Sequence, residues 1–221
     1  MAPTKGELTR QRIVDVALDL FAEQGYDATT MRAIAQRAGV STGNAYQYFA
    51  GKDHLVQAFY ERSQLEHGDA AEAALLASRD LTERVHGVLT ARIDTMQPYR
   101  AFAASFFRTA ADPASPLSPF SDQSAPARAM SQALYAEAVS GSSAKLPEAL
   151  RDELPGLLWI YQMGVVLYWV HDRSPGSRST YLLVDRTVPM VVRLIGLARY
   201  RVLRSLLDDV LSLVRDLRSS R

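Results

Sequence analysis

Cysteine is absent from the 221-residue sequence, which excludes a disulfide framework and thiolate metal sites. The four histidines are scattered without metal-ligand spacing, and no nucleophile-elbow, phosphate-loop or dinucleotide motif occurs. We therefore expect that the chain is not an enzyme and that it holds no metal and no cofactor.

Long apolar runs are also missing. No run approaches the roughly 18 apolar residues of a membrane span, and the first ten residues lack the apolar core of a signal peptide. We expect a cytoplasmic protein with no membrane partner. Glycine is scarce, at 12 residues, and strand-type alternation is rare, so the predicted fold class is all-α.

The sequence also lacks an excess of positive charge, because its net charge is only +1. Basic and acidic residues balance over residues 1–60, so overall charge does not indicate a nucleic-acid binder. The distribution is more informative, since residues 29–52 carry Arg32, Arg37 and Lys52 and no acidic residue. This local basicity suffices for the few phosphate contacts that a small DNA-binding module makes.

Residues 29–52 hold the most informative pattern. Thr29 or Thr30 stands at the N-cap position of a short helix, and Gly39 can end that helix in a left-handed conformation. Ser41 can then cap a second short helix. This arrangement predicts a helix-turn-helix. The apolar residues that define the first helix are Met31, Ile34, Ala35 and Ala38.

The second helix has two different faces. Ala45 and Phe49 lie one turn apart and are expected to pack inward. The outward residues can approach DNA, because Gln and Asn pair with adenine edges and Thr and Tyr reach phosphates. A plain three-helix subdomain with half-buried tyrosines is the alternative. The outward residues are Thr42, Gly43, Tyr46 and Gln47.

The N-terminal quarter of the chain resembles the DNA-binding domain of the TetR family of transcriptional regulators. The matching features run from the helix around Phe21 through Ala38-Gly39-Val40-Ser41 to Leu55. The resemblance implies that Thr30 and Lys52 touch phosphates and that the second helix reads bases. The implied DNA contacts are Thr30, Arg32, Ser41, Thr42, Gly43, Asn44, Tyr46, Gln47, Tyr48 and Lys52. Two positions depart from the family, which often has His at Tyr48 and Leu or Ile at Ala45.

The predicted domains are 1–66, a TetR-type three-helix DNA-binding domain, and 67–221, a larger helical ligand-binding and dimerisation domain. The helix from Lys52 is expected to end near His67, because Gly68 is a natural break. Residues 111–126 are rich in proline and serine and are expected to form an exposed, mobile loop.

Two apolar segments near the C-terminus resemble the helices that form the dimer interface in this family. The first covers residues 154–172, with Pro155 expected at the helix start, and the second covers residues 179–195. An additional helix over residues 198–217 is predicted to pack within its own subunit or across the dimer.

Aromatic side chains exceed what a helical bundle requires, and together they suggest a pocket for a small apolar or aromatic effector. For each residue the alternative is an ordinary place in the core. The candidate effector contacts are Tyr99, Arg100, Phe102, Phe106, Trp159, Gln162, Met163, Tyr168, Trp169 and His171.

These observations predict a homodimeric repressor that leaves a palindromic DNA operator when it binds a small molecule. One alternative is a helical ligand-binding protein or enzyme with a vestigial DNA-binding motif. Another is a regulator that works mainly through a protein partner.

Overall fold

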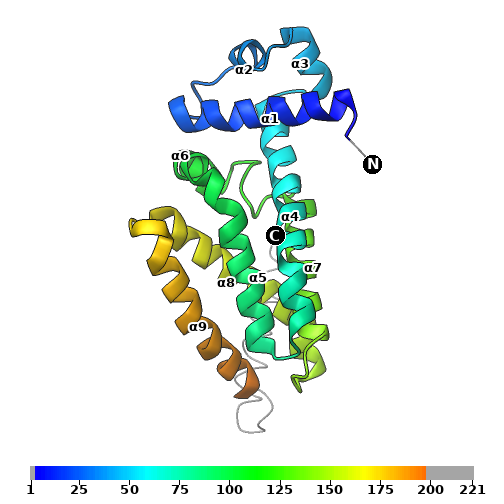
Figure 1. Ribbon diagram of the computed structural model, residues 1–221, viewed down its shortest axis with the longest axis vertical. Helices are drawn as coiled ribbons and strands as arrows, with labels where there is room; N and C mark the ends of the chain where they lie inside the picture. Colours follow the sequence, from blue (N-terminus) through cyan, green and yellow to red (C-terminus); the bar gives the residue numbers. More distant parts are fainter. Residues whose placement is uncertain (1–2, 198–221) are drawn as a thin grey trace. The chain divides into compact units, whose positions relative to one another are not determined.

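The computed structural model describes residues 3–197, and every regular element in that range is helical (Figure 1). The all-α class is therefore confirmed for this part of the chain. The predicted helix over residues 198–217 lies outside the described residues. The helices are α1 (Lys5–Gln24), α2 (Met31–Arg37), α3 (Thr42–Tyr48), α4 (Lys52–Ala77), α5 (Leu81–Met96), α6 (Arg100–Ala111), α7 (Ala125–Ser140), α8 (Glu148–His171) and α9 (Arg178–Leu197), with single 3₁₀ turns η1 (Gln97–Tyr99) and η2 (Pro175–Ser177).

The chain divides into two compact units. Unit 1 combines residues 1–66 with 95–130, and unit 2 combines residues 67–94 with 131–221. Unit 1 therefore contains α6 and the segment after it, in addition to the first three helices. The division at residue 66 into a DNA-binding domain and an effector and dimerisation domain stays a prediction.

Unit 1 is built around α1. A capping box starts this helix, in which the Thr4 amide donates to Glu7 Oε2 (2.6 Å) and the Glu7 amide donates to Thr4 Oγ1 (3.2 Å). Figure 1 shows α2 and α3 together on one side of α1. The apolar face of α1 joins Ile34 and the first turns of α4 in one buried core. The buried core includes Ile13, Ala17, Phe21, Ile34, Ala35, Ala45, Leu55, Val56, Phe59, Phe102 and Phe106.

The segment between α6 and α7 is more ordered than its composition predicts. Leu117 is 2% exposed and belongs to the core of unit 1. The Tyr60 hydroxyl donates to the Leu117 carbonyl oxygen (2.9 Å), and the Arg128 guanidinium donates to the Pro119 carbonyl oxygen (2.7 Å). The prediction of an exposed loop is therefore wrong at Leu117, because this apolar side chain fills a site in the core.

The predicted break at Gly68 is wrong, since α4 continues to Ala77. His67, Ala71 and Leu75 recur at a spacing of four residues and are all buried. Burial of this face offsets the cost of about 1 kcal/mol that a glycine imposes inside a helix.

The predicted start of the next long helix is also wrong, because α8 begins at Glu148 and Pro155 lies inside it. Leu150, Leu154 and Leu158 lie one turn apart on either side of the proline, and all three are buried. Proline removes one backbone donor from a helix interior. Burial of this leucine face keeps the two segments in one helix.

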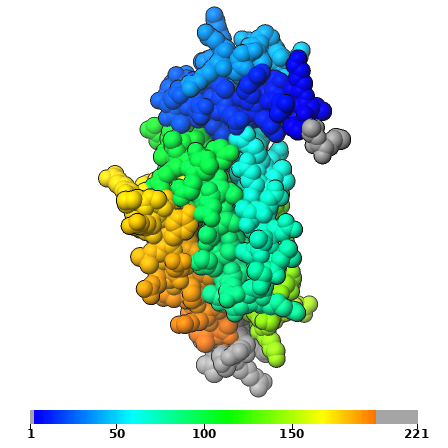
Figure 2. All heavy atoms as spheres, viewed as in Figure 1, coloured from blue at the N-terminus to red at the C-terminus, as the bar shows by residue number. Residues whose placement is uncertain are grey.

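Unit 2 joins its helices through polar contacts as well as apolar ones. The Tyr135 hydroxyl donates to Gln162 Oε1 (2.9 Å), and Gln162 Nε2 donates to Ser131 Oγ (3.1 Å), which links α7 to α8. The amide and hydroxyl of Thr180 both donate to the Asp172 carboxylate (2.9 and 2.7 Å), which fixes the turn before α9. In Figure 2 the orange atoms of α9 lie at the surface of this unit.

Candidate nucleic-acid interface

Two short capped helices form the helix-turn-helix, as the sequence predicts. Thr30 caps α2 by accepting from the Ala33 amide (3.2 Å), and Ser41 caps α3 by accepting from the Asn44 amide (3.1 Å). Gly39 lies between them with φ at 68°, a left-handed conformation that glycine adopts without strain. The helix-turn-helix prediction is confirmed at the level of backbone geometry.

The two faces of α3 divide as predicted. Ala45 is fully buried and Phe49 is 3% exposed, so both anchor the helix in the core of unit 1. The opposite face is open to solvent, and Tyr46 is 52% exposed. The exposed residues of this face are Thr42, Gly43, Tyr46 and Gln47. The arrangement presents amide, hydroxyl and aromatic groups beside an accessible backbone.

Two predicted contact residues of α3 are only partly accessible. Asn44 is half-buried, and Tyr48 packs against the core of unit 1. The Tyr48 hydroxyl lies near Gly6, where a Cβ atom would be 3.8 Å away. Tyr48 therefore supports α1 as well as bordering the exposed face.

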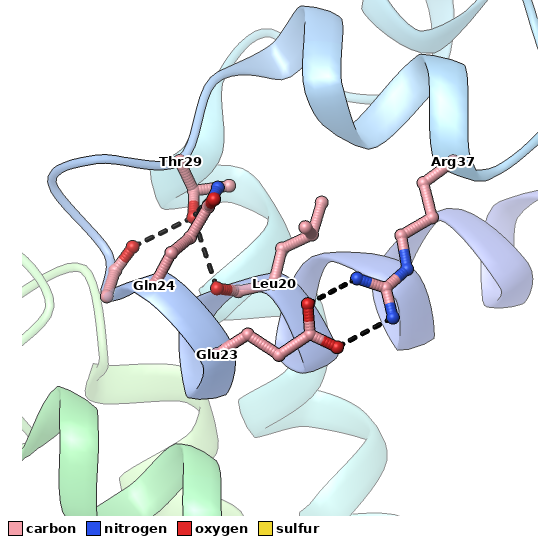
Figure 3. Close-up of polar contacts among 6 residues, drawn as sticks. Leu20, Glu23, Gln24, Thr29 and Arg37 are labelled. Carbon is pink, nitrogen blue, oxygen red and sulfur yellow. Dashed lines mark hydrogen bonds and ion pairs between the residues drawn. The ribbon is translucent and has the colours of Figure 1, made fainter.

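The basic residues of the motif are in different situations. Arg32 is exposed at the start of α2. Arg37 instead makes a two-point pair with Glu23 of α1, with distances of 2.5 and 2.7 Å between the guanidinium nitrogens and carboxylate oxygens (Figure 3). The hydrogen bonds from Arg37 lower the pKa of the Glu23 carboxyl. Arg37 thus ties α2 to α1.

Lys52 is turned back toward the protein. Its ammonium group donates to the carbonyl oxygens of Tyr26 (2.6 Å) and Asp27 (3.4 Å) and lies 4.4 Å from the centroid of the Tyr26 ring. Its phosphate contact stays a prediction, as do the DNA contacts of the other nine residues.

Thr29 is not the N-cap that the sequence offered as an alternative to Thr30, and its structural role, like that of Tyr26, was not predicted. Thr29 is 1% exposed, and its hydroxyl donates to the Gly25 carbonyl oxygen (2.8 Å) and accepts from Gln24 Nε2 (3.1 Å) (Figure 3). Thr29 thereby closes the turn after α1, while Thr30 is the cap of α2. The adjacent pair of threonines was the available signal for this division of roles.

The ten predicted effector contacts belong to different units. Phe102 and Phe106 are buried in the core of unit 1, and Tyr99 packs beside them, with its ring centroid 4.8 Å from that of Phe59. Arg100 is also in unit 1 and is half-buried. The α8 residues belong to unit 2: Trp159, Gln162 and Trp169 are buried, Met163 is half-buried, and Tyr168 and His171 are exposed. Their role as effector contacts stays a prediction.

Two open hollows occur on the part of the chain that the structure describes. One, of about 510 Å³, lies in unit 1 beside Asp27, Arg108 and Asp112, and one of about 430 Å³ lies in unit 2 beside Ala74, His86 and Gly87. None of the ten predicted effector contacts lines either hollow. Among residues 3–197, no helix is long and apolar enough to cross a membrane, and no group of His, Asp and Glu is arranged to hold a metal ion.

Comparison with known proteins matches both parts of the chain. Residues 13–59 match the family "Bacterial regulatory proteins, tetR family", and residues 84–213 match "Tetracyclin repressor-like, C-terminal domain". The regulator UidR of Escherichia coli K12 is 33% identical over 85 residues, which are 38% of this chain and 40% of that protein. The matched region thus spans about two fifths of that relative.

Solved structures share the fold over most of the chain. A TetR-family regulator from Syntrophomonas wolfei superposes with a TM-score of 0.70 at 19% identity, covering 90% of this chain and all of that one. A TetR regulator from Nitrosomonas europaea gives 0.63 at 22% identity, covering 82% of this chain and 96% of that one. With an N-terminal helix-turn-helix and a matching C-terminal region over more than half its length, this chain belongs to the TetR family of transcriptional regulators.

Proposed function

We propose that this chain is a transcriptional repressor whose α3 enters the major groove of DNA. The observation that carries the proposal is the polar, exposed face of α3 opposite its buried anchors, Ala45 and Phe49. Gln47 can make a bidentate pair with adenine, and Gly43 allows the backbone to approach the groove closely. Thr42 and Tyr46 can contact phosphates at the edges of the groove.

We propose that the repressor is a homodimer that uses α8 and α9 as its interface. Ile160, Gly164, Leu167 and Tyr168 lie along one face of α8, and all four are exposed. On α9, Leu182 (55%), Met190 (60%) and Leu194 (69%) are exposed too. Contiguous exposed apolar surface of this kind marks a protein–protein contact. A two-fold dimer recognises a palindromic operator.

The proposed regulatory signal is a small apolar or aromatic effector. Trp159 and Trp169 of α8 are buried aromatic side chains, and Gln162 of the same helix is a buried amide; sites for small apolar ligands combine such groups. The effector would release the operator by binding preferentially to a form with lower DNA affinity. Intrinsic tryptophan fluorescence, followed across a panel of apolar and aromatic compounds, tests this part of the proposal.

Selection of bound sequences from random duplex DNA tests the DNA-binding function directly. The purified chain should enrich a palindrome with half-sites about one helical turn or slightly more apart. A confirmed dimer that enriches no sequence would contradict the proposal. Tight ligand binding or turnover without DNA affinity would instead favour a helical ligand-binding protein or enzyme. A repressor of this kind acts in the cytoplasm.

A further inference from the structure

Arg62 lies on α4 about one turn before this helix passes from unit 1 into unit 2. The part of α4 that belongs to unit 1 ends at Glu66, and the helix continues without a break to Ala77. The chain returns to unit 1 at Thr95, near the end of α5. Contacts that Arg62 makes with α1 therefore act on a helix that both units share.

A short ion pair joins Arg62 to α1. Arg62 Nη1 lies 2.6 Å from Asp15 Oδ1, although the two residues are 47 positions apart in the sequence. The Arg62 side chain is only 22% exposed, whereas that of Asp15 is 57% exposed. Because the protein shields the arginine, solvent screens this pair less than it screens a pair of fully exposed side chains.

Two further groups surround the same guanidinium. Glu66, one turn later on α4, places its Oε1 atom 3.7 Å from Arg62 Nε. The ring of Tyr99, from η1, has its centroid 5.6 Å from Arg62 Cζ. That ring also packs on Phe59 of α4, with 4.8 Å between the centroids. Arg62 thus brings α1, α4 and η1 together at one point of unit 1.

The ion pair to Asp15 adds direction to the packing of α1 on α4. Most of that packing is apolar, with Ile13, Phe21, Val56 and Phe59 in one buried core. Apolar contacts hold two helices together but are non-directional. A charge-assisted hydrogen bond depends on geometry, so one at the edge of the core opposes rotation of α1 against α4.

We propose that Arg62 is a positioning residue that sets which half-site spacing the dimer recognises. The helices α1 to α3 share one core, and α4 leads from this core into unit 2, which contains the exposed faces of α8 and α9. In a dimer joined through those faces, the distance between the two copies of α3 depends on the angle at which α1 is held on α4. This inference rests on the proposed homodimeric DNA-binding function.

Operators that differ only in half-site spacing test this role. Arg62→Met keeps an unbranched side chain and removes the guanidinium. Its preference for the selected operator over one lengthened by one base pair should fall about threefold, the effect of losing one partly exposed ion pair. Arg37→Met is the matched control, because it breaks the pair with Glu23 between α2 and α1 and leaves α4 untouched. Whatever its affinity, the control should keep the wild-type spacing preference.

Asp15→Asn tests the same pair from its exposed side, and it decides the question alone if Arg62→Met does not fold. The double variant should lose no more spacing preference than Arg62→Met does. Sedimentation and circular dichroism establish that each variant is a folded dimer at the assay temperature.

A wild-type spacing preference in folded Arg62→Met or Asp15→Asn, even with lower thermal stability, would show a purely structural role and overturn the inference. Additive losses in the double variant would also overturn it. A wild-type chain that enriches no palindrome would overturn the proposed function, and the inference with it.

Discussion

The guanidinium group of Arg84 occupies the space that a Cβ atom on Gly141 would need. Arg84 is 5% exposed and serves as a shared cap, since its donors reach the last carbonyl groups of two helices, α4 and α7. The accepting carbonyl oxygens belong to Leu75, Ser78 (2.8 Å), Glu137 (2.8 Å) and Ala138 (2.9 Å). Position 141 therefore requires glycine because a larger side chain would collide with Arg84, and not because of its backbone conformation.

Gly141→Ala should lower the free energy of unfolding by about 1–3 kcal/mol, because Arg84 cannot move aside without losing hydrogen bonds. Urea denaturation measures the change. In an Arg84→Lys background, which has a smaller head group, the same substitution should cost less. Strictly additive effects of the two changes would contradict the contact.

Gly68 and Gly87 form a matched pair of glycines inside helices of unit 2. A Cβ atom on Gly68 would meet only Leu134 Cδ2 at 4.0 Å, whereas one on Gly87 would overlap Ala74. Gly68→Ala should therefore stabilise the protein by about 0.5–1 kcal/mol through lower chain entropy in the unfolded state. Gly87→Ala should destabilise it. Thermal unfolding of both variants checks the opposite signs.

His67 should make the stability of the protein sensitive to acid. The side chain is fully buried, and its Nε2–H donates to the Val88 carbonyl oxygen (2.8 Å). Burial, and secondarily the charge of Arg92, lower the pKa of His67 to about 3. An unfolded histidine has a pKa of about 6.5, so only the unfolded chain binds this proton as the pH falls from 6.5 toward 3. The free energy of unfolding should therefore decrease over that window.

Replacing His67 isolates this effect. In the wild type, His67 should make the free energy of unfolding change by up to about 1.4 kcal/mol per pH unit, and His67→Gln should remove this contribution. Urea denaturation of both proteins at pH 7 and pH 5 measures the difference. His54→Gln, at an exposed position of α4, is the control. Parallel pH profiles for the wild type and His67→Gln would refute the prediction.

The apolar face of α9 should hold the dimer together. Met190→Glu places a charge at a position that is 60% exposed in the single chain, and it should shift sedimentation toward the monomer. Leu76→Glu, at a position of α4 that is 77% exposed, is the control and should leave the mass unchanged. The assigned interface would be ruled out if both variants dissociated the dimer equally, or if neither variant dissociated it.

Tyr46 should be required for operator binding. Tyr46→Ala removes an exposed aromatic group from α3 without touching the buried anchors, so the dimer should persist while operator affinity falls at least about tenfold. Leu65→Ala, at a 61% exposed position of α4, should bind DNA as the wild type does. Fluorescence anisotropy with the selected operator measures both. Unchanged binding by Tyr46→Ala would refute the assigned face.

Local signals in the sequence predicted the geometry of the helix-turn-helix well. The caps at Thr30 and Ser41 and the left-handed Gly39 depend on neighbouring residues only, and all three are confirmed. The inward placement of Ala45 and Phe49 followed from helical spacing alone. Such features are readable because each involves residues within about one turn of each other.

Features that depend on distant partners were not predictable. Nothing local to Lys52 shows that its ammonium group reaches Tyr26, which lies 26 positions earlier. Gly68 and Pro155 are helix breakers by local propensity, yet burial on either side keeps α4 and α8 continuous. The aromatic composition of residues 99–107 does not show that α6 packs on α1, where Phe102 and Phe106 join the core.

The packing of α6 on α1 sets a limit on how regulators of this type can be recombined. The Ser105 hydroxyl donates to the Phe21 carbonyl oxygen (2.8 Å), and Phe102 covers the same end of α1. A chimera cut at residue 66 would carry α1 without its own α6, which helps to bury Phe21. It would join this α1 to an α6 whose side chains fit the α1 of a different protein. Exchange of specificity between relatives should therefore transplant α1 to α3 together with the facing residues of α6.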